Sequence, residues 1–250
     1  MNFSINQLSS LAKLISTNPN EAKAFIKLAS VDVLKSLGDG KYTIVLDNKT
    51  LTAQSDKPLS EGAKYWSQLT QPKNGTAQLS NLQKMPQQLQ NLQNSQFEYS
   101  LKDLQTLLKS QKPETLMKQN LLEHLSSAST KDEFSSLSNL LLSLQNNTLT
   151  IPIRQDNYFS ILQFKKRYNK KSKRTQLDFY AALEFLGPVS GVITLEDGSV
   201  NIDLNVAFDK TKNFLEDDMD NFSYDINISL VENIEPLYNA NNNALLDVSI

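Results

Sequence analysis

The feature that most constrains the fold is a long run of alternating apolar and polar residues in the last third of the chain. Apolar side chains occupy every second position from Leu177 to Phe185 and again from Val200 to Val206. This period of two is typical of strands that bury one face. Between Phe208 and Ile226 the spacing becomes helical, and alternation returns from Ile226 to Leu230. The order strand, strand, helix, strand predicts a mixed sheet with one packed helix.

A strongly basic segment lies just before this run. The stretch from Tyr158 to Phe164 is apolar enough for a strand, and KKRYNKKSKR follows it as the expected hairpin tip. Its basic residues are Lys165, Lys166, Arg167, Lys170, Lys171, Lys173 and Arg174. They indicate either a solvated tip that deters edge-to-edge pairing or a contact with an acidic protein surface, anionic lipid or nucleic acid. Tyr168 alone is too little for a base-stacking platform, so nucleic acid is the least favoured partner.

The first part of the chain predicts short strands after two helices. Apolar positions alternate from Val31 to Leu69, with turns at Gly38-Asp39-Gly40 and Asp47-Asn48. Four short strands in so little sequence favour a small barrel-like sheet whose edges are hidden or nearly so. The following segment is rich in Asn and Gln and contains Pro72 and Pro86, a composition typical of a linker.

The middle of the chain is Leu-rich with helical spacing. Pro113 suits the first turn of a helix, and Thr130 with Glu133 forms the pattern of a capping box. Together these patterns predict an α+β chain with a small N-terminal β-barrel-like domain, a Leu-rich helical middle and a C-terminal mixed sheet with one packed helix. The expected boundaries are N-terminal helices at 1–30, the small β domain at 31–70, a polar linker at 71–98, helices at 99–148, the C-terminal α+β domain at 149–232 and a tail at 233–250.

Composition excludes several classes of function. The net charge of −2 argues against a general coat for nucleic acid or membranes. The absence of cysteine removes disulfides, thiolate metal sites and thiol nucleophiles. No leader-like or membrane-spanning stretch is present, so we expect a cytoplasmic protein without membrane insertion.

No group of residues predicts chemistry. His124 is the single histidine, and no second His and no Cys accompany it to form a transition-metal site. The carboxylates from Glu216 to Asp220 lack the order of a calcium loop, and Gly38-Asp39-Gly40 lies between strands rather than before a helix. We therefore expect no catalytic, cofactor-binding or metal-binding residues, and a protein that is not an enzyme.

One family resemblance rests on LEFLGPVSGVITLEDGSVNIDL, from Leu183 to Leu204. This stretch looks like the C-terminal domain of the flagellar hook-length control family (FliK-like). In that family an apolar strand ends at a Leu-Gly step, here Leu186-Gly187, and two strands, a helix and a final apolar strand follow. The helix here contains Phe214-Leu215, and the last strand runs from Ile226 to Leu230. The Val31–Leu69 segment is also similar to a small β domain that some members carry.

The resemblance implies a non-enzymatic flagellar regulator that switches the substrate specificity of export through protein-protein contacts. It also leaves open that the protein is itself exported through the flagellar apparatus. Its partner would be the cytoplasmic domain of the export gate, with hook or hook-cap subunits as further candidates. The residues expected to contact a partner are Phe185, Gly187, Pro188, Val189, Gly191, Lys170, Lys171 and Arg174. Two other functions stay open. One is a cytoplasmic scaffold or chaperone that binds a partner helix through its Leu-rich helices. The other is an oligonucleotide-binding protein that uses the N-terminal β domain and the basic hairpin.

Overall fold

In a computed structural model of the protein, the described residues are 28–46, 48–70, 78–91, 97–155, 158–169, 174–196, 199–217, 219 and 225–239. The helices expected within 1–30 lie outside these residues, except that Leu28 to Ser30 belong to the first described strand. The expected tail is described only as far as residue 239.

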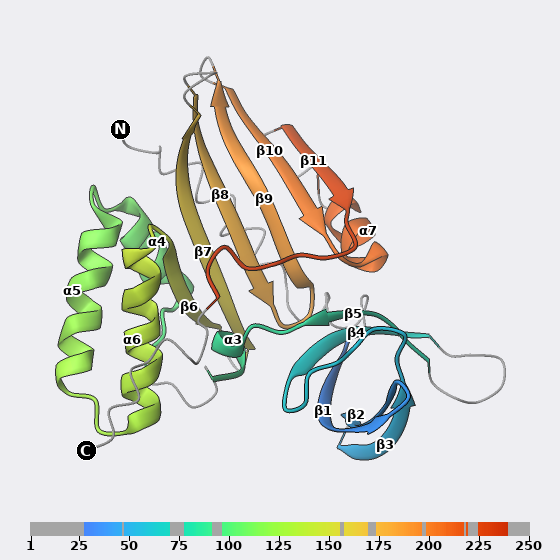
Figure 1. The fold of residues 1–250 in the computed structure, drawn as a ribbon. Coiled ribbons are helices and arrows are strands. Elements are labelled where there is room, and N and C mark those ends of the chain that lie inside the picture. The colour runs from blue at the N-terminus through green and yellow to red at the C-terminus, as the bar shows by residue number, and fades with distance from the viewer. Residues whose placement is uncertain are drawn as a thin grey trace.

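An antiparallel sheet of five strands forms the N-terminal part (Figure 1). Its strands are β1 (Leu28–Gly38), β2 (Lys41–Leu46), β3 (Lys49–Gln54), β4 (Lys64–Thr70) and β5 (Gln78–Lys84). The order β3-β2-β1-β4-β5 places the long β1 between β2 and β4. Among the described residues β3 and β5 are not paired with each other, so the sheet is open rather than a closed barrel.

Strand β5 corrects the prediction of a polar linker over 71–98. This strand pairs antiparallel with β4, and the short helix α3 (Gln87–Asn91) follows it. The side chain of Gln83 is buried, and its Nε2 donates to the carbonyl of Glu232 at 2.7 Å. Asn81 likewise donates to the carbonyl of Ala207. The amides that resembled a linker composition therefore bond to distant backbone, which turns a polar segment into a strand.

Three helices follow, and they pack on one edge of the second sheet. They are α4 (Leu101–Lys109), α5 (Pro113–Ser126) and α6 (Lys131–Gln145). Pro113 opens α5 as expected. The Thr130 side chain accepts from the Glu133 amide at 3.2 Å, but the Glu133 carboxylate accepts from Ser129 rather than from Thr130. Helices α4 and α6 contact β6, and α5 packs on α6.

The C-terminal sheet is mixed and has six strands. Its elements are β6 (Leu149–Gln155), β7 (Tyr158–Asn169), β8 (Arg174–Leu183), β9 (Gly187–Glu196), β10 (Ser199–Val206), α7 (Asp209–Asp217) and β11 (Asp225–Leu230). The order is β11-β10-β9-β8-β7-β6, and only the β10–β11 pair is parallel. Helix α7 connects these two parallel strands and buries Leu215 in the main core. The α+β class predicted from the sequence is confirmed.

The two sheets are joined by a second apolar cluster, which we call the junction. Its buried members are Trp66, Met85, Leu89, Ile161, Tyr180, Ala182, Ala207, Phe208 and Ile234. The indole Nε1 of Trp66 donates to the carbonyl of Glu184 at 3.1 Å. The junction therefore combines residues of β4, β7 and β8 that lie far apart in the sequence.

The segment Val231–Asn239, which we call the strap, completes the junction. It leaves β11 and crosses the sheet towards β7 and α3 (Figure 1). The buried side chain of Gln163 on β7 holds its far end: Nε2 donates to the Tyr238 carbonyl at 2.7 Å, and Oε1 accepts from the Tyr238 amide at 3.1 Å. The strap thus ties the edge strand β11 to β7, which lies next to the opposite edge of the sheet.

Candidate functional site

Most of the residues predicted to contact a partner at the β8–β9 turn are internal. Gly187, Pro188, Val189 and Gly191 are buried, and Phe185 is half-buried. A buried side chain cannot present itself to another protein, so the expected partner-facing rim is not formed by these four residues. Phe185 is the member that keeps an accessible surface, and its ring packs edge-on against Tyr158 with centroids 4.6 Å apart.

The two glycines of this turn are required by packing. Gly187 has a φ of +77°, and a Cβ there would lie 2.6 Å from Cε2 of Phe208. A Cβ at Gly191 would lie 2.7 Å from Cε1 of Phe179 and would also overlap the carbonyl oxygen of Asp203. These close approaches explain why both positions need glycine, and no contact with another protein is required to explain them. The sequence shows where a glycine stands but not which atoms approach it.

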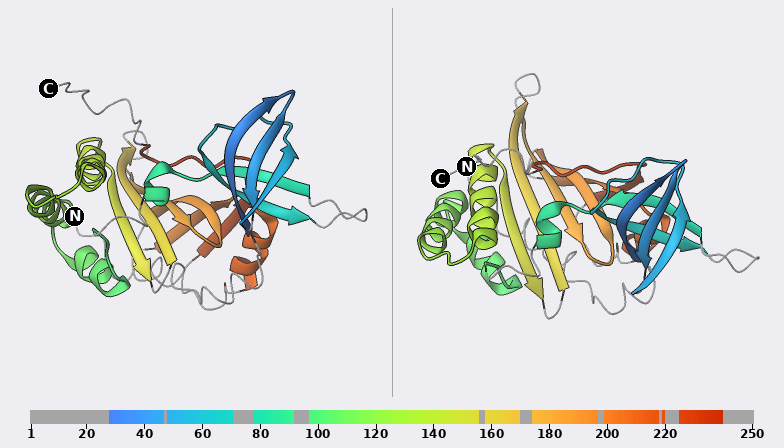
Figure 2. Two further views of the ribbon diagram at one scale, coloured as in Figure 1. Left: turned by 90° about the horizontal axis from the view of Figure 1, so that it is seen from below. Right: turned by 60° about the horizontal axis from the view of Figure 1, so that its bottom comes forward.

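The predicted basic residues fall at the β7–β8 hairpin. Lys170 and Lys171 lie outside the described residues, and Arg174 opens β8 opposite Asn169. Strand β6 accompanies β7 only as far as the Leu149–Phe164 pair. From Lys165 to Asn169, β7 is paired on its other side with β8. We call this segment, Lys165–Asn169, the basic edge; it extends beyond the helices in the right-hand view of Figure 2.

The basic edge carries an excess of positive charge. Lys166, Arg167 and Tyr168 are exposed, and Lys165 is half-buried. The guanidinium of Arg167 forms an ion pair with the Asp178 carboxylate on β8, whose side chain is 10% exposed. From 165 to 178 the sequence contains seven basic residues and a single acidic residue. Asp178 therefore offsets a small part of the positive charge of this sequence segment, and such a charge attracts anionic groups.

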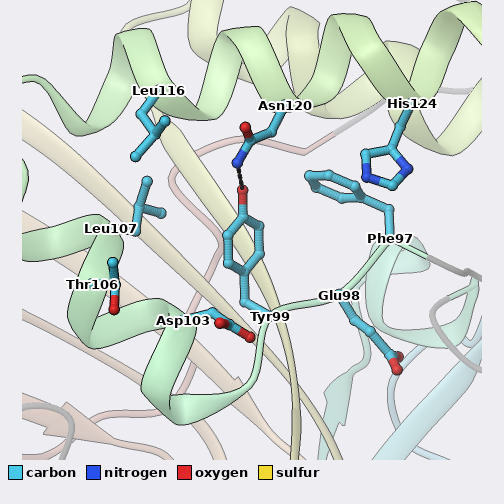
Figure 3. A pocket seen from close by; sticks show the side chains of 9 residues that line it. All are labelled: Phe97, Glu98, Tyr99, Asp103, Thr106, Leu107, Leu116, Asn120 and His124. Carbon is cyan, nitrogen blue, oxygen red and sulfur yellow. Dashed lines mark hydrogen bonds between the residues drawn. The ribbon is translucent and has the colours of Figure 1, made fainter.

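A cavity of about 310 Å³ lies between α4, α5 and the segment that precedes α4 (Figure 3). Its lining residues are Phe97, Glu98, Tyr99, Asp103, Thr106, Leu107, Leu116, Asn120 and His124. The sequence analysis considered His124 and did not identify the cavity, because its walls come from three separate elements. No sequence signal marks such a site.

Two of the polar side chains that line the cavity, Tyr99 and Asn120, bond to each other, and Asp103 bonds to the helix cap Ser100. The Tyr99 hydroxyl accepts from Nδ2 of Asn120 at 3.1 Å and contacts Sδ of Met117 at 3.1 Å (Figure 3). Burial raises the pKa of Tyr99. Hydrogen bonds from the Ser100 hydroxyl and amide lower the pKa of Asp103. These groups cap helix α4 and connect the wall of the cavity to α5.

His124 adds an aromatic contact to the wall of the cavity. Its ring meets the ring of Phe97 edge-on, with centroids 5.0 Å apart. In the part of the chain that the structure describes, no three His, Asp or Glu side chains are grouped so that they could hold a metal ion. Within the same residues, no helix is both long and apolar enough to cross a membrane.

The Leu-rich helices use most of their apolar surface internally. Their buried residues include Leu104, Leu107, Met117, Leu121, Leu137 and Leu140. Leu122 and Phe134 remain exposed, at 48% and 51%. A groove for a partner helix needs several apolar anchors along its length. The two exposed residues are the surface that these helices offer to such a partner.

Comparison with known proteins gives no match to the chain, whether with protein-family models, with curated proteins or with solved structures.

Proposed function

We propose that the chain is a non-enzymatic regulator that resembles hook-length control proteins and acts through protein contacts. In this proposal its C-terminal part binds the cytoplasmic domain of the flagellar export gate and changes which substrates are secreted. Hook or hook-cap subunits are further candidate partners. The protein works in the cytoplasm, with passage through the export apparatus as the alternative.

The order of elements after Leu186-Gly187 is the observation that carries the proposal. Strands β9 and β10 form an antiparallel pair, α7 follows, and β11 returns parallel to β10. This is the order of strand, strand, helix and strand on which the family resemblance rests. Leu215 anchors α7 in the core, which is the helix position that the resemblance assigns to a Leu.

The surface next to this unit favours recognition of another protein. Phe185 and Tyr158 form a half-buried aromatic pair near the β8–β9 turn. Aromatic residues that keep some accessible area are common anchors at protein interfaces. The basic edge provides charge on the same sheet, which can steer an acidic partner.

A binding experiment with the full chain and the purified cytoplasmic domain of the export gate tests the proposal. We expect a complex, and we expect Phe185→Ala to weaken it by about tenfold because aromatic anchors contribute most at interfaces. Phe134→Ala on α6 is the matched control, since it removes an exposed aromatic ring from another surface. Absence of binding by the folded wild-type chain would reject this function.

The scaffold alternative keeps one supporting observation, the exposed pair Leu122 and Phe134. It expects Phe134→Ala to abolish capture of an amphipathic partner helix while Phe185→Ala has no effect. The same two variants therefore separate the two functions. The oligonucleotide alternative has less support, because the exposed large apolar residues of the described N-terminal sheet are Leu34, Leu37 and Leu51, with no aromatic ring among them.

A further inference from the structure

The strap lies along the junction as a segment that is neither helix nor strand (Figure 1). In the part of the chain that the structure describes, its one bond from backbone to backbone joins the Val231 amide to the Val206 carbonyl at 2.9 Å. Pro236 favours an extended backbone at Glu235, the residue before it. The strap is therefore bound in the manner of an extended peptide rather than as a further strand of the sheet.

Side-chain amides from both sheets hold the backbone of the strap near its two ends. Gln83 on β5 donates from Nε2 to the Glu232 carbonyl at 2.7 Å. Gln163 on β7 donates to the Tyr238 carbonyl at 2.7 Å and accepts from the Tyr238 amide at 3.1 Å. Both glutamines are buried. These bonds reach main-chain groups, which every sequence carries, so they can hold any extended segment in the same place.

Between these two points the strap buries one apolar side chain. Ile234 is 7% exposed and belongs to the same cluster as Trp66 and Phe208. Leu237 is half-buried and packs against this cluster. Sites for extended peptides combine main-chain hydrogen bonds, which give affinity, with pockets for particular side chains, which give specificity. The surroundings of the strap contain both parts.

We call the surface under the strap the strap site; its residues are Trp66, Gln83, Gln163, Tyr180 and Phe208. The strap should leave this site more easily than the strands separate. Segments with few buried apolar contacts and few backbone bonds open at a lower free energy than the whole protein unfolds. Ile234 is the one buried residue of the strap, whereas β9 and β10 pair continuously from Val189 to Glu196.

We propose that the strap site is a binding site for an extended peptide, and that the strap is its occupant within the same chain. A partner segment that carries a branched aliphatic residue in the place of Ile234 competes with the strap. The strap has the advantage of being covalently attached, with an effective concentration on the order of millimolar. The site is thus closed until the strap is released. This inference goes beyond the proposed function and does not depend on the flagellar partner.

Trp66 reports the release of the strap, because it is the single tryptophan of the chain and is 1% exposed. Ile234→Ser in the full chain should raise the acrylamide quenching constant of Trp66 by about threefold or more, since a strap that opens admits solvent to the indole. Leu230→Ser is the matched control. It makes the same kind of change at a side chain that is 46% exposed, and quenching should stay within about 20% of the wild type.

A synthetic peptide with the sequence of Val231 to Asn239 tests the strap site directly. It should bind the Ile234→Ser variant and return the quenching of Trp66 towards the wild-type value. The same peptide with Ile234→Ser should bind this variant at least about tenfold more weakly, because it lacks the apolar anchor. The wild-type chain should bind the unchanged peptide at least about tenfold more weakly than the variant does, because its own strap fills the site.

Hydrogen exchange of the wild type is a second measurement, and it decides the question if Ile234→Ser does not fold. The Tyr238 amide should exchange through an opening of lower free energy than the amides of β10. The bond from Tyr238 to Gln163 makes this amide a marker of the far end of the strap. Exchange at Tyr238 that requires unfolding of the whole protein would show that the strap is a fixed part of the core.

Two further results would overturn the inference. One is equal quenching of Trp66 in the Ile234→Ser and Leu230→Ser variants, and the other is a folded Ile234→Ser variant that does not bind the peptide. Failure here is distinct from failure of the proposed function. Gate binding by the wild type without peptide binding by the variant rejects the strap site alone, whereas peptide binding without gate binding rejects the proposed function alone.

Discussion

The core of the C-terminal sheet and the junction between the two sheets are both buried, but different chemistry holds them together. The core face is apolar across β8, β9 and β10, with residues such as Phe179, Val189 and Leu204. The junction includes Tyr180, whose buried hydroxyl has no hydrogen-bond partner among the described residues, and the segments that form it carry the buried amides of Gln83 and Gln163. Shape therefore dominates in the core, while the pairing of each polar atom matters in the junction.

The largest expected effect comes from removing the centre of the junction. Trp66→Ala deletes an indole that is 1% exposed and its hydrogen bond to the Glu184 carbonyl. We expect a loss of about 3 to 5 kcal/mol in the free energy of unfolding. Chemical denaturation measures it, and the exposed Phe134→Ala should cost less than about 0.5 kcal/mol. Equal costs in the two variants would show that the junction is not a packed interior.

The second largest loss of stability is expected where backbone and ring atoms lie close to Gly191 in the core. Gly191→Ala places a methyl group against the Asp203 carbonyl and the Phe179 ring, and the backbone atom cannot move aside cheaply. We expect a cost of about 3 kcal/mol. The control is Gly38→Ala, where φ is +86° and no atom lies within 4 Å, so backbone strain of about 1 to 2 kcal/mol is the whole cost. Thermal unfolding compares the two, and the prediction is wrong if Gly38→Ala is the more damaging change.

The polar contacts of the strap should give a smaller but local effect. Gln163→Leu keeps the volume similar and leaves the Tyr238 amide and carbonyl without their partner. We expect a cost of about 2 kcal/mol and faster hydrogen exchange at Tyr238. Gln176→Leu, a half-buried position on β8, is the control and should leave exchange in the strap unchanged. Unaltered exchange at Tyr238 in Gln163→Leu would mean that the strap is held by other contacts.

The smallest effect has the opposite sign. Tyr180→Phe removes a buried hydroxyl that has no partner, so we expect a gain of about 1 kcal/mol rather than a loss. Burial raises the pKa of Tyr180 above the ordinary value of 10.0. As the pH rises, the Tyr180 hydroxyl therefore loses its proton in the unfolded chain before it does so in the folded protein. The free energy of unfolding of the wild type should fall as the pH rises above about 10.

Unfolding as a function of pH checks this linkage. The Tyr180 contribution is fully present below the ordinary tyrosine pKa and declines above it, so the Phe variant should lose less stability at alkaline pH. Tyr168→Phe is the control, because that side chain is 59% exposed. A destabilised Tyr180→Phe would indicate that the hydroxyl has a partner after all.

The alternating pattern was sufficient for β10 and β11, because each of these strands buries mainly one face. The pattern from Val200 to Val206 predicts β10, and the return at Ile226 predicts β11. Strand β5 could not be predicted in this way. Its amides, Asn81 and Gln83, bond to backbone carbonyls 126 and 149 residues away. Local composition contains no information about partners at that distance.

The candidate surfaces were predicted less well, for a related reason. The basic run identifies a hairpin, but it does not show that β6 ends its pairing with β7 at Phe164. The Gly187 and Gly191 positions are visible in the sequence, and their roles depend on Phe208 and Phe179, which approach from other elements. The cavity beside α4 and α5 combines three elements and has no linear signature.

The strap sets an order of events for a chain that is made from its N-terminus onward. Trp66 leaves the ribosome long before Ile234, which packs in the same cluster, and before Tyr238, which bonds to Gln163. At about 5 to 20 residues per second, this interval is on the order of ten seconds or more. During that time the apolar residues of the incomplete junction remain exposed, and chaperones can bind them. Synthesis of the last residues of the strap allows this surface to be covered.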